Sequence, residues 1–172
     1  PDQRGQPPRR AAEDTVTAAP RGARGGRVVA ESVTAPLRVG ILGAARIAQL
    51  AIVKPAHATG TRLVTVAARD RKRAEAFAAE HGVERATDSY AAVLADPEVE
   101  VVYNPLPNAF HGPWNLAAVE AGKHVLSEKP FASTAEEAAE VRAAAEKNGV
   151  TVVEGLHYLF HPVMQRLFAL LD

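Results

Sequence analysis

Residues 37–48 read LRVGILGAARIA, and this stretch decides the fold. The run LRVGIL at 37–42 is largely apolar, as expected for a strand whose two faces are both covered. Gly43 follows the run, at the point where the backbone needs the freedom of a tight turn. A helix is predicted from about Arg46. Residues 37–48 therefore form the first strand–turn–helix unit of the chain.

The same unit recurs toward the C-terminus: an apolar run, a turn, a helix-forming run and a glycine before the next strand. Glycines 82, 122 and 149 stand where a helix ends in a left-handed residue. Asp88 is the expected N-cap of one helix, and Ser133 to Glu136 fits a capping box for another. Further strands are predicted at 62–68, 99–104, 123–127 and 150–155, and further helices at 71–81, 89–95, 114–121, 133–148 and 162–171. The alternation predicts an α/β fold, a doubly wound parallel sheet with right-handed crossovers.

Composition narrows the function classes. The chain has 172 residues, 20 basic and 20 acidic side chains, and no cysteine. A zero net charge gives no reason to expect nucleic acid or a membrane surface as partner. Without cysteine there is neither a disulfide framework nor a cysteine-based metal site, and we expect no metal. The lack of cysteine is compatible with the cytoplasm, where we expect the protein. No apolar run is long enough to span a bilayer.

Residues 1–35 differ from the rest of the chain. They are rich in Pro, Gly, Arg and Ala without apolar periodicity, which predicts a flexible tail. Residues 28–30 could add a short edge strand. The pair Arg9-Arg10 also fits a twin-arginine signal, but no apolar segment follows it. The tail arginines could contact an anionic partner, although an idle, solvated tail accounts for them as well.

The glycine turn resembles a dinucleotide fingerprint and lacks one of its glycines. Gly43 is placed for close approach of the backbone to a pyrophosphate, and Gly40 lies in the strand end. Ala45 replaces a common turn glycine. The helix would direct its free N–H groups at the phosphates. The alternative is an ordinary strand–helix turn, but the repeated units favour cofactor binding. The predicted contacts are Gly40, Gly43, Ala44, Ala45, Arg46 and Ile47.

The end of the second strand bears on the choice between NAD and NADP. In this fold an acidic residue there accepts from the ribose hydroxyls of NAD, whereas an arginine suits the 2′-phosphate of NADP. The chain has Arg69 at the strand end and Arg73 one helical turn later. A guanidinium binds phosphate through two parallel hydrogen bonds, so the pair favours NADP. Because Asp70 could accept from the ribose hydroxyls, NAD remains an alternative cofactor. The arginines could also be solvated side chains at the start of a helix, with no role in binding.

Two later strand ends also carry polar side chains, and ligands bind beyond such ends. One is the loop after residue 104, with Pro105, Leu106, Asn108 and His111 as expected cofactor contacts. The other is Glu128-Lys129-Pro130. A lysine at the end of an interior strand is expected to be partly desolvated and able to exchange protons or polarise a substrate oxygen. A cis Lys129–Pro130 bond is expected. The alternative is a structural lysine paired with Glu128 or with a helix end.

At these motifs the chain resembles the Gfo/Idh/MocA family, which includes glucose–fructose oxidoreductase, inositol dehydrogenases and dimeric dihydrodiol dehydrogenases. The resemblance covers residues 37–168 and rests on GKHVLSEKP (122–130), YNPLPNAFHGPW (103–114) and EGLHYLFHP (154–162). It implies that Lys129 lies near the nicotinamide and the reacting hydroxyl. Glu128 and the 106–108 loop would lie near the cofactor, His111 near its ribose. Ala45 and Asn104 depart from the family pattern, at the phosphate turn and the pocket floor.

The resemblance also implies a domain division. We expect a dinucleotide-binding Rossmann domain at 36–156 and, at 157–172, the start of a helix that leads to an α+β substrate domain missing from this chain. Phe160, Val163, Leu167, Phe168 and Leu170 form an apolar stripe on that helix. Such a stripe suggests truncation, burial against another chain or a helix folded back on this domain, so a homo-oligomer stays open.

These observations leave three hypotheses. The first is an NADP-dependent oxidoreductase in which hydride passes between nicotinamide C4 and a carbinol carbon of a sugar, inositol or cyclic diol, with Lys129 assisting proton transfer. The second is a nucleotide-binding module without turnover. The third is nucleic-acid binding through the tail, which mixed charge disfavours.

Overall fold

The computed structural model describes residues 35–171 and shows a single six-stranded sheet in that range. All neighbouring strands are parallel, in the order β3-β2-β1-β4-β5-β6. This confirms the predicted doubly wound α/β fold. The tail and the strand at 28–30 lie outside the described residues. The strands are β1 (Arg38–Leu42), β2 (Arg62–Ala67), β3 (Arg85–Thr87), β4 (Val101–Asn104), β5 (His124–Ser127) and β6 (Val152–Glu154).

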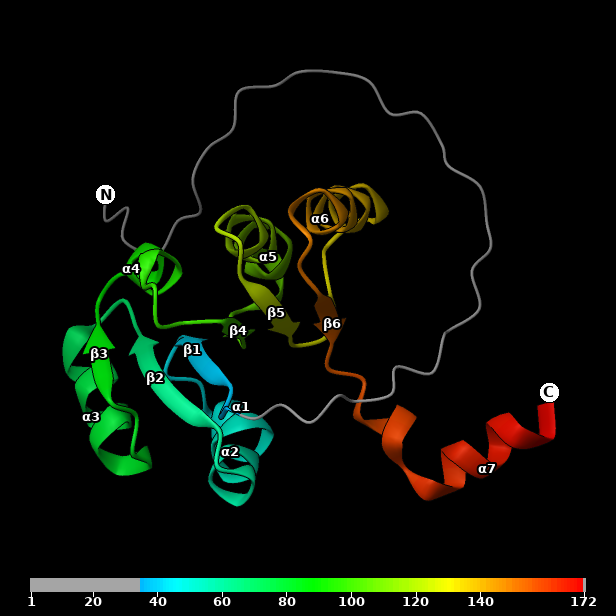
Figure 1. Ribbon diagram of the computed structural model, residues 1–172, viewed down its shortest axis with the longest axis horizontal. Coiled ribbons are helices and arrows are strands. Elements are labelled where there is room, and N and C mark those ends of the chain that lie inside the picture. The colour runs from blue at the N-terminus through cyan, green and yellow to red at the C-terminus, as the bar shows by residue number, and fades with distance from the viewer. Residues whose placement is uncertain (1–34, 172) are drawn as a thin grey trace.

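Helices cover both faces of the sheet, as Figure 1 shows. On one face lie the helical segments that follow β1 and β2, and on the other those that follow β3, β4 and β5. Each face has its own apolar core, and near-continuous burial along β1 and β2 matches a sheet covered twice. The helices are α1 (Arg46–Ala48), α2 (Lys54–Thr59), α3 (Arg71–His81), α4 (Tyr90–Ala95), α5 (His111–Glu120), α6 (Ala135–Asn148) and α7 (Pro162–Leu171).

The first helical region is interrupted by a π-helical turn, η1 (Gln49–Val53), between α1 and α2. The N–H of Lys54 bonds to the carbonyl of Gln49, five residues back. Pro55 follows directly and has no N–H to donate to the carbonyl four residues earlier. The proline therefore accounts for the irregular turn.

Three local details differ from the sequence-based expectations. The short strand β3 was not predicted. Ser89 rather than Asp88 caps α4, with its side chain accepting from Ala92 N–H. Thr134 rather than Ser133 caps α6 and accepts from Glu137 N–H. The predicted helix ends are confirmed, because glycines 82, 122 and 149 all have positive φ.

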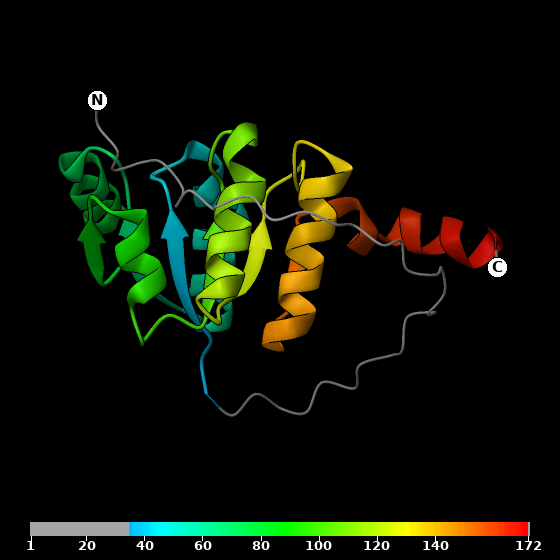
Figure 2. The same cartoon turned by 90° about the horizontal axis from the view of Figure 1, so that it is seen from above.

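The order of the strands fixes where a ligand can bind. β1 and β4 are neighbours although two strands separate them in sequence. The helices that follow them leave toward opposite faces, α1 and α2 to one and α5 to the other (Figure 1). Figure 2 shows the strands pointing the same way between these layers. The chain therefore diverges at the carboxyl ends of β1 and β4, which is where such folds form a ligand crevice.

Gly40 lies inside β1, where α4 approaches the sheet closely. A Cβ atom at this position would lie 2.5 Å from Val93 Cγ1 and 3.0 Å from Val99 Cγ1. Because both valines are fully or nearly fully buried, they have no room to move away. Gly40 is thus required for packing between β1 and α4.

We expect Gly40→Ala to lower the free energy of unfolding by about 1–3 kcal/mol, the cost of overpacking a filled core. Urea unfolding followed by circular dichroism measures it. In Gly40→Ala/Val93→Ala the added methyl gains space, so the double variant should lose less stability than the two single variants summed. Additive losses would contradict the contact.

The C-terminal helix α7 lies apart from the sheet. It follows the 3-10 turn η3 (His157–Phe160) and extends beyond β6, as Figures 1 and 2 show. Its predicted range is confirmed, and no residue of it is buried. Phe160 is 82% exposed, and the predicted apolar stripe is uncovered within residues 35–171.

Candidate cofactor site

An open cleft of about 520 Å³ lies at the carboxyl ends of the central strands. Its walls come from the segments that follow β1, β2 and β4, together with the first residue of α4. These segments are distant in sequence and meet because parallel strands end at one edge of the sheet. The lining residues are Gly43, Ala44, Ala45, Ala68, Arg69, Asp70, Arg73, Tyr90, Pro105, Leu106 and Pro107.

The glycine turn forms one wall of the cleft. Gly43 has φ +101°, in the region that favours glycine, and its N–H donates to the Ala67 carbonyl at 2.7 Å. A Cβ on Gly43 would lie 3.2 Å from Leu106 Cδ2, across the turn. The turn is therefore anchored to β2. Its backbone, without a side chain, faces the loop that follows β4 (residues 105–107, the β4 loop).

Ala45 takes the place of the missing fingerprint glycine without backbone strain. Its φ of −90° and ψ of 141° are extended values that alanine adopts without strain. Ala45 is also the N-cap of α1, and no side chain caps that helix. The first amides of the helix thus have no side-chain acceptor, as a phosphate-binding turn requires. Arg46 and Ile47 begin α1 with exposed side chains.

Two guanidinium groups lie at the β2 side of the cleft. Arg69 and Arg73 both line it and are exposed. Arg73 Nη2 donates to the Ala44 carbonyl at 3.4 Å and so reaches across to the glycine turn. Asp70 lines the cleft too, but its Oδ1 accepts from Lys72 N–H at 2.9 Å and caps α3. One oxygen of Asp70 is thus engaged by the helix, and one nitrogen of Arg73 is engaged by the glycine turn.

Tyr90 is a cleft residue that the sequence did not reveal. It is the first residue of α4, is buried, and stands edge-on to the Trp114 ring at 5.3 Å between centroids. Burial raises the pKa of its hydroxyl, and the positive charges of Arg69 and Arg73 oppose that rise. The phenol therefore lies within electrostatic reach of both arginines. Its position just beyond β3 was the available signal, but β3 was itself missed.

The β4 loop supplies the opposite wall. Pro105 and Leu106 line the cleft as predicted from their place at the strand end. Leu106 N–H donates to Asn104 Oδ1 at 3.3 Å, which fixes the turn. Asn108 is exposed and starts the 3-10 turn η2 (Asn108–Phe110). His111 is 1% exposed and bonds to backbone carbonyls.

The Glu128-Lys129-Pro130 segment follows β5. Glu128 is buried, and its Oε1 accepts from the Tyr103 hydroxyl at 2.9 Å. Burial raises the pKa of Tyr103, and the hydrogen bond to the Glu128 carboxylate raises it further. Lys129 is exposed rather than partly desolvated, and no ion pair joins it to Glu128 or to another residue of 35–171. The expected cis Lys129–Pro130 bond is present.

A buried amide network joins the ends of β4 and β5. Asn104 Nδ2 donates to Asn115 Oδ1 at 2.8 Å, and Asn115 Nδ2 donates to Ser127 Oγ at 2.9 Å. Asn115 also donates to the Phe131 carbonyl at 3.1 Å. Asn104, Asn115 and Ser127 are fully buried, so their pairing holds the two strand ends in a fixed relation.

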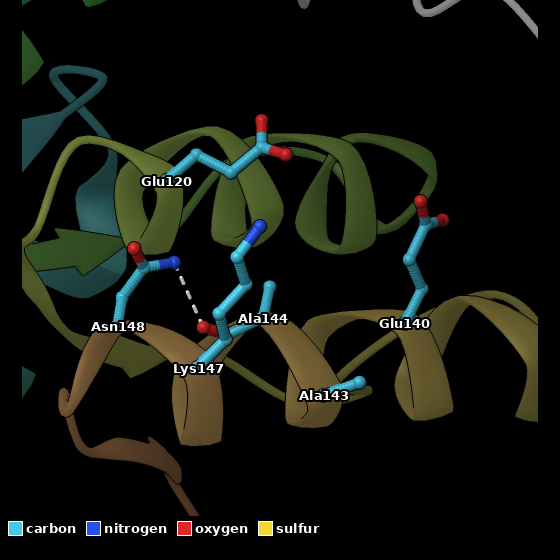
Figure 3. A pocket seen from close by; sticks show the side chains of 6 residues that line it. All are labelled: Glu120, Glu140, Ala143, Ala144, Lys147 and Asn148. Carbon is cyan, nitrogen blue, oxygen red and sulfur yellow. Dashed lines mark hydrogen bonds between the residues drawn. The ribbon is translucent and has the colours of Figure 1, made fainter.

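A second hollow, of about 450 Å³, lies between α5 and α6 (Figure 3). It is lined by Glu120, Glu140, Ala143, Ala144, Lys147 and Asn148. Every lining side chain is at least partly exposed, and Asn148 Nδ2 bonds to its own helix at Ala144. With no buried polar group directed into it, this hollow is a weaker candidate than the cleft.

Across residues 35–171, no three His, Cys, Asp or Glu side chains gather as a metal site would require. None of the helices in that range has the length and hydropathy needed to cross a bilayer.

Comparison with known proteins agrees with this geometry. A model of the Gfo/Idh/MocA group, described as an oxidoreductase family with an NAD-binding Rossmann fold, matches residues 37–156. The chain is 42% identical to D-xylose 1-dehydrogenase (NADP(+)) 2 of Haloferax volcanii over 127 residues, 74% of this chain and 39% of that protein. It is 38% identical to trans-1,2-dihydrobenzene-1,2-diol dehydrogenase of Mus musculus over 133 residues, 76% of this chain and 40% of that one.

A solved structure matches as well. KijD10, a 3-ketoreductase from Actinomadura kijaniata in complex with NADP and TDP-benzene, superposes with a TM-score of 0.74 at 34% identity. The match covers 80% of this chain and 42% of KijD10. The chain thus spans less than half the length of each of these relatives.

Proposed function

The chain belongs to the Gfo/Idh/MocA oxidoreductase family, and on that premise we propose that its cleft binds NADP(H) in preference to NAD(H). We propose further that the protein transfers hydride between NADP(H) and a carbinol carbon of a sugar, inositol or cyclic diol. The observation that carries the first proposal is the cleft itself, which combines a side-chain-free glycine turn with two exposed guanidinium groups.

The proposed preference for NADP follows from the charged side chains at the end of β2. A 2′-phosphate carries negative charge and offers oxygens that a planar guanidinium can bind in pairs. Arg69 and Arg73 line the cleft, and Tyr90 lies within reach of both charges. NAD would instead need a free carboxylate for its ribose hydroxyls. Asp70 already accepts a bond from Lys72 N–H.

The proposed role of Lys129 follows from its place at the end of β5. Because β5 is the second strand from β1 in the sheet, its end lies on the order of 10 Å from the glycine turn. A bound nicotinamide would supply the hydride chemistry. The exposed Lys129 ammonium would hold or exchange the proton of the substrate hydroxyl. The xylose and dihydrodiol dehydrogenases among the relatives support a polyhydroxylated or diol substrate.

The affinity of the purified chain for NADPH and NADH tests the cofactor proposal, measured by cofactor fluorescence or calorimetry. NADP-dependent absorbance at the reduced-nicotinamide band, with a panel of aldoses, inositols and cyclic diols, tests turnover. Binding without turnover on any of these would favour a nucleotide-binding module. Absence of binding by either nucleotide would refute the proposal altogether.

We expect Arg69→Ala/Arg73→Ala to weaken NADPH binding by about 100-fold, because two charge-assisted hydrogen bonds to phosphate are lost. NADH affinity should change by less than about threefold, since NADH has no 2′-phosphate. Arg71→Ala/Lys72→Ala is the matched control. It removes two charges from the same helix turn, at residues that do not line the cleft. An equal loss in the control, or equal losses for NADPH and NADH, would contradict phosphate recognition by the arginine pair.

A further inference from the structure

The buried side chain of His111 has an unusual pair of partners. Nδ1 lies 2.6 Å from the Pro130 carbonyl oxygen, and Nε2 lies 2.5 Å from the Leu106 carbonyl oxygen. The side chain is 1% exposed, so water does not replace either contact. Both ring nitrogens therefore face atoms that can only accept hydrogen bonds.

Neutral imidazole has one N–H, so only one of these two contacts could be a hydrogen bond. The other nitrogen would then direct its lone pair at a carbonyl oxygen at 2.5 or 2.6 Å, which is repulsive. We propose that His111 is held as a doubly protonated imidazolium that donates to both carbonyls and clamps the β4 loop to the Lys129–Pro130 turn.

The groups around His111 affect whether its ring can carry a positive charge. Its place at the first position of α5 and its burial both disfavour a positive charge. Glu137 of α6 packs against the neighbouring Gly112, and Glu128 lies two residues before Pro130 in the turn. Neither of these two carboxylates nor Lys129 forms an ion pair with the His111 ring within residues 35–171. The two carbonyl contacts favour the doubly protonated ring, because a neutral ring can donate to only one of the two oxygens.

The clamp connects the two parts of the proposed site. Leu106 lines the cleft, and Pro130 directly follows Lys129. His111 thus acts as a positioning residue: it sets the Lys129 turn relative to the cleft wall without itself contacting the cofactor. This deepens the proposed function and rests on it for the link to NADP. It departs from the ribose contact expected from the sequence.

The protonation state is tested on the unaltered chain by NMR with ¹⁵N-labelled histidine. Both His111 ring nitrogens should show directly bonded protons at neutral pH. His57 is exposed on α2 and serves as the internal reference. A His111 nitrogen without a proton at neutral pH would overturn the proposal. This readout needs neither a variant nor a cofactor.

The positioning role is tested by His111→Gln, whose neutral amide cannot supply both bonds in the same geometry. NADPH affinity should fall by about tenfold. Val83→Ala is the control for lost stability, because Val83 is buried in the core of the opposite sheet face. Unchanged affinity in folded His111→Gln, or an equal loss in Val83→Ala, would overturn the clamp. If the unaltered chain binds neither NADPH nor NADH, the proposed function fails, whereas the NMR result on the imidazolium stands.

Discussion

Gly43→Val is expected to weaken NADPH binding by at least about 100-fold while leaving the sheet folded. A β-branched residue at φ +101° costs of order 1–3 kcal/mol in backbone strain. Its Cβ would lie 3.2 Å from Leu106 Cδ2, and its two methyl groups would extend into the space between the turn and the β4 loop. Relief of the strain must displace backbone that the cofactor diphosphate would approach. About 2.7 kcal/mol suffices for a hundredfold loss of affinity.

Gly60→Val is the matched control for this prediction. Gly60 also has positive φ, at +73°, and ends α2 away from the cleft. A Cβ there meets nothing within 4 Å, so the substitution adds backbone strain without a new contact. Circular dichroism and thermal unfolding check folding in both variants, and cofactor fluorescence measures affinity. The prediction is wrong if folded Gly43→Val binds NADPH within about threefold of the unaltered chain, or if Gly60→Val loses as much.

The sheet was predictable because the central strands are largely apolar and α3, α5 and α6 each end at or next to a glycine. Those signals are local, and the helices at 71–81 and 162–171 were located to the residue. β3 was missed because its three residues, Arg-Ala-Thr, are too few to show an apolar run or a recognisable alternation. The helix caps at Ser89 and Thr134 were misplaced by one residue, since neighbouring polar side chains can serve equally well on sequence grounds.

The candidate site was predictable only where backbone conformation or strand ends determine it. Gly43, Arg69 and Arg73 follow strands whose ends meet at one edge, so topology alone brings them together. Gly40 packs against Val93, a contact with a helix more than 50 residues later. Likewise, the carbonyl partners of His111 come from two separate loops. Such contacts depend on how distant segments approach, and no local pattern in the sequence carries that information.

Lys129→Ala is expected to lower the rate of NADP-linked turnover by about 10²- to 10⁴-fold, the usual contribution of a positioned proton-transfer group. NADPH affinity should stay within about threefold, because the proposed partner of the Lys129 ammonium is the substrate hydroxyl and not a phosphate of the cofactor. Loss confined to the rate would place the ammonium at the reacting hydroxyl. Full activity in the variant would remove that role, and a parallel loss of affinity would point to cofactor binding instead.

The position of Lys129 can also be tested without any substrate. Its ammonium is exposed and has no ion-pair partner within residues 35–171, so a water-soluble acylating reagent should modify it. NADPH at about ten times its Kd should slow that modification roughly tenfold, since only the free chain then reacts. Lys147 lies exposed in the hollow between α5 and α6 and should react at the same rate with and without NADPH (Figure 3). Mass spectrometry of both peptides gives the two rates in one sample.

Equal protection of Lys129 and Lys147 would mean a general effect of the nucleotide. A nicotinamide ring beside the Lys129 ammonium must hinder the reagent. If NADPH binds and neither lysine is protected, the Lys129 ammonium therefore does not lie beside the nicotinamide.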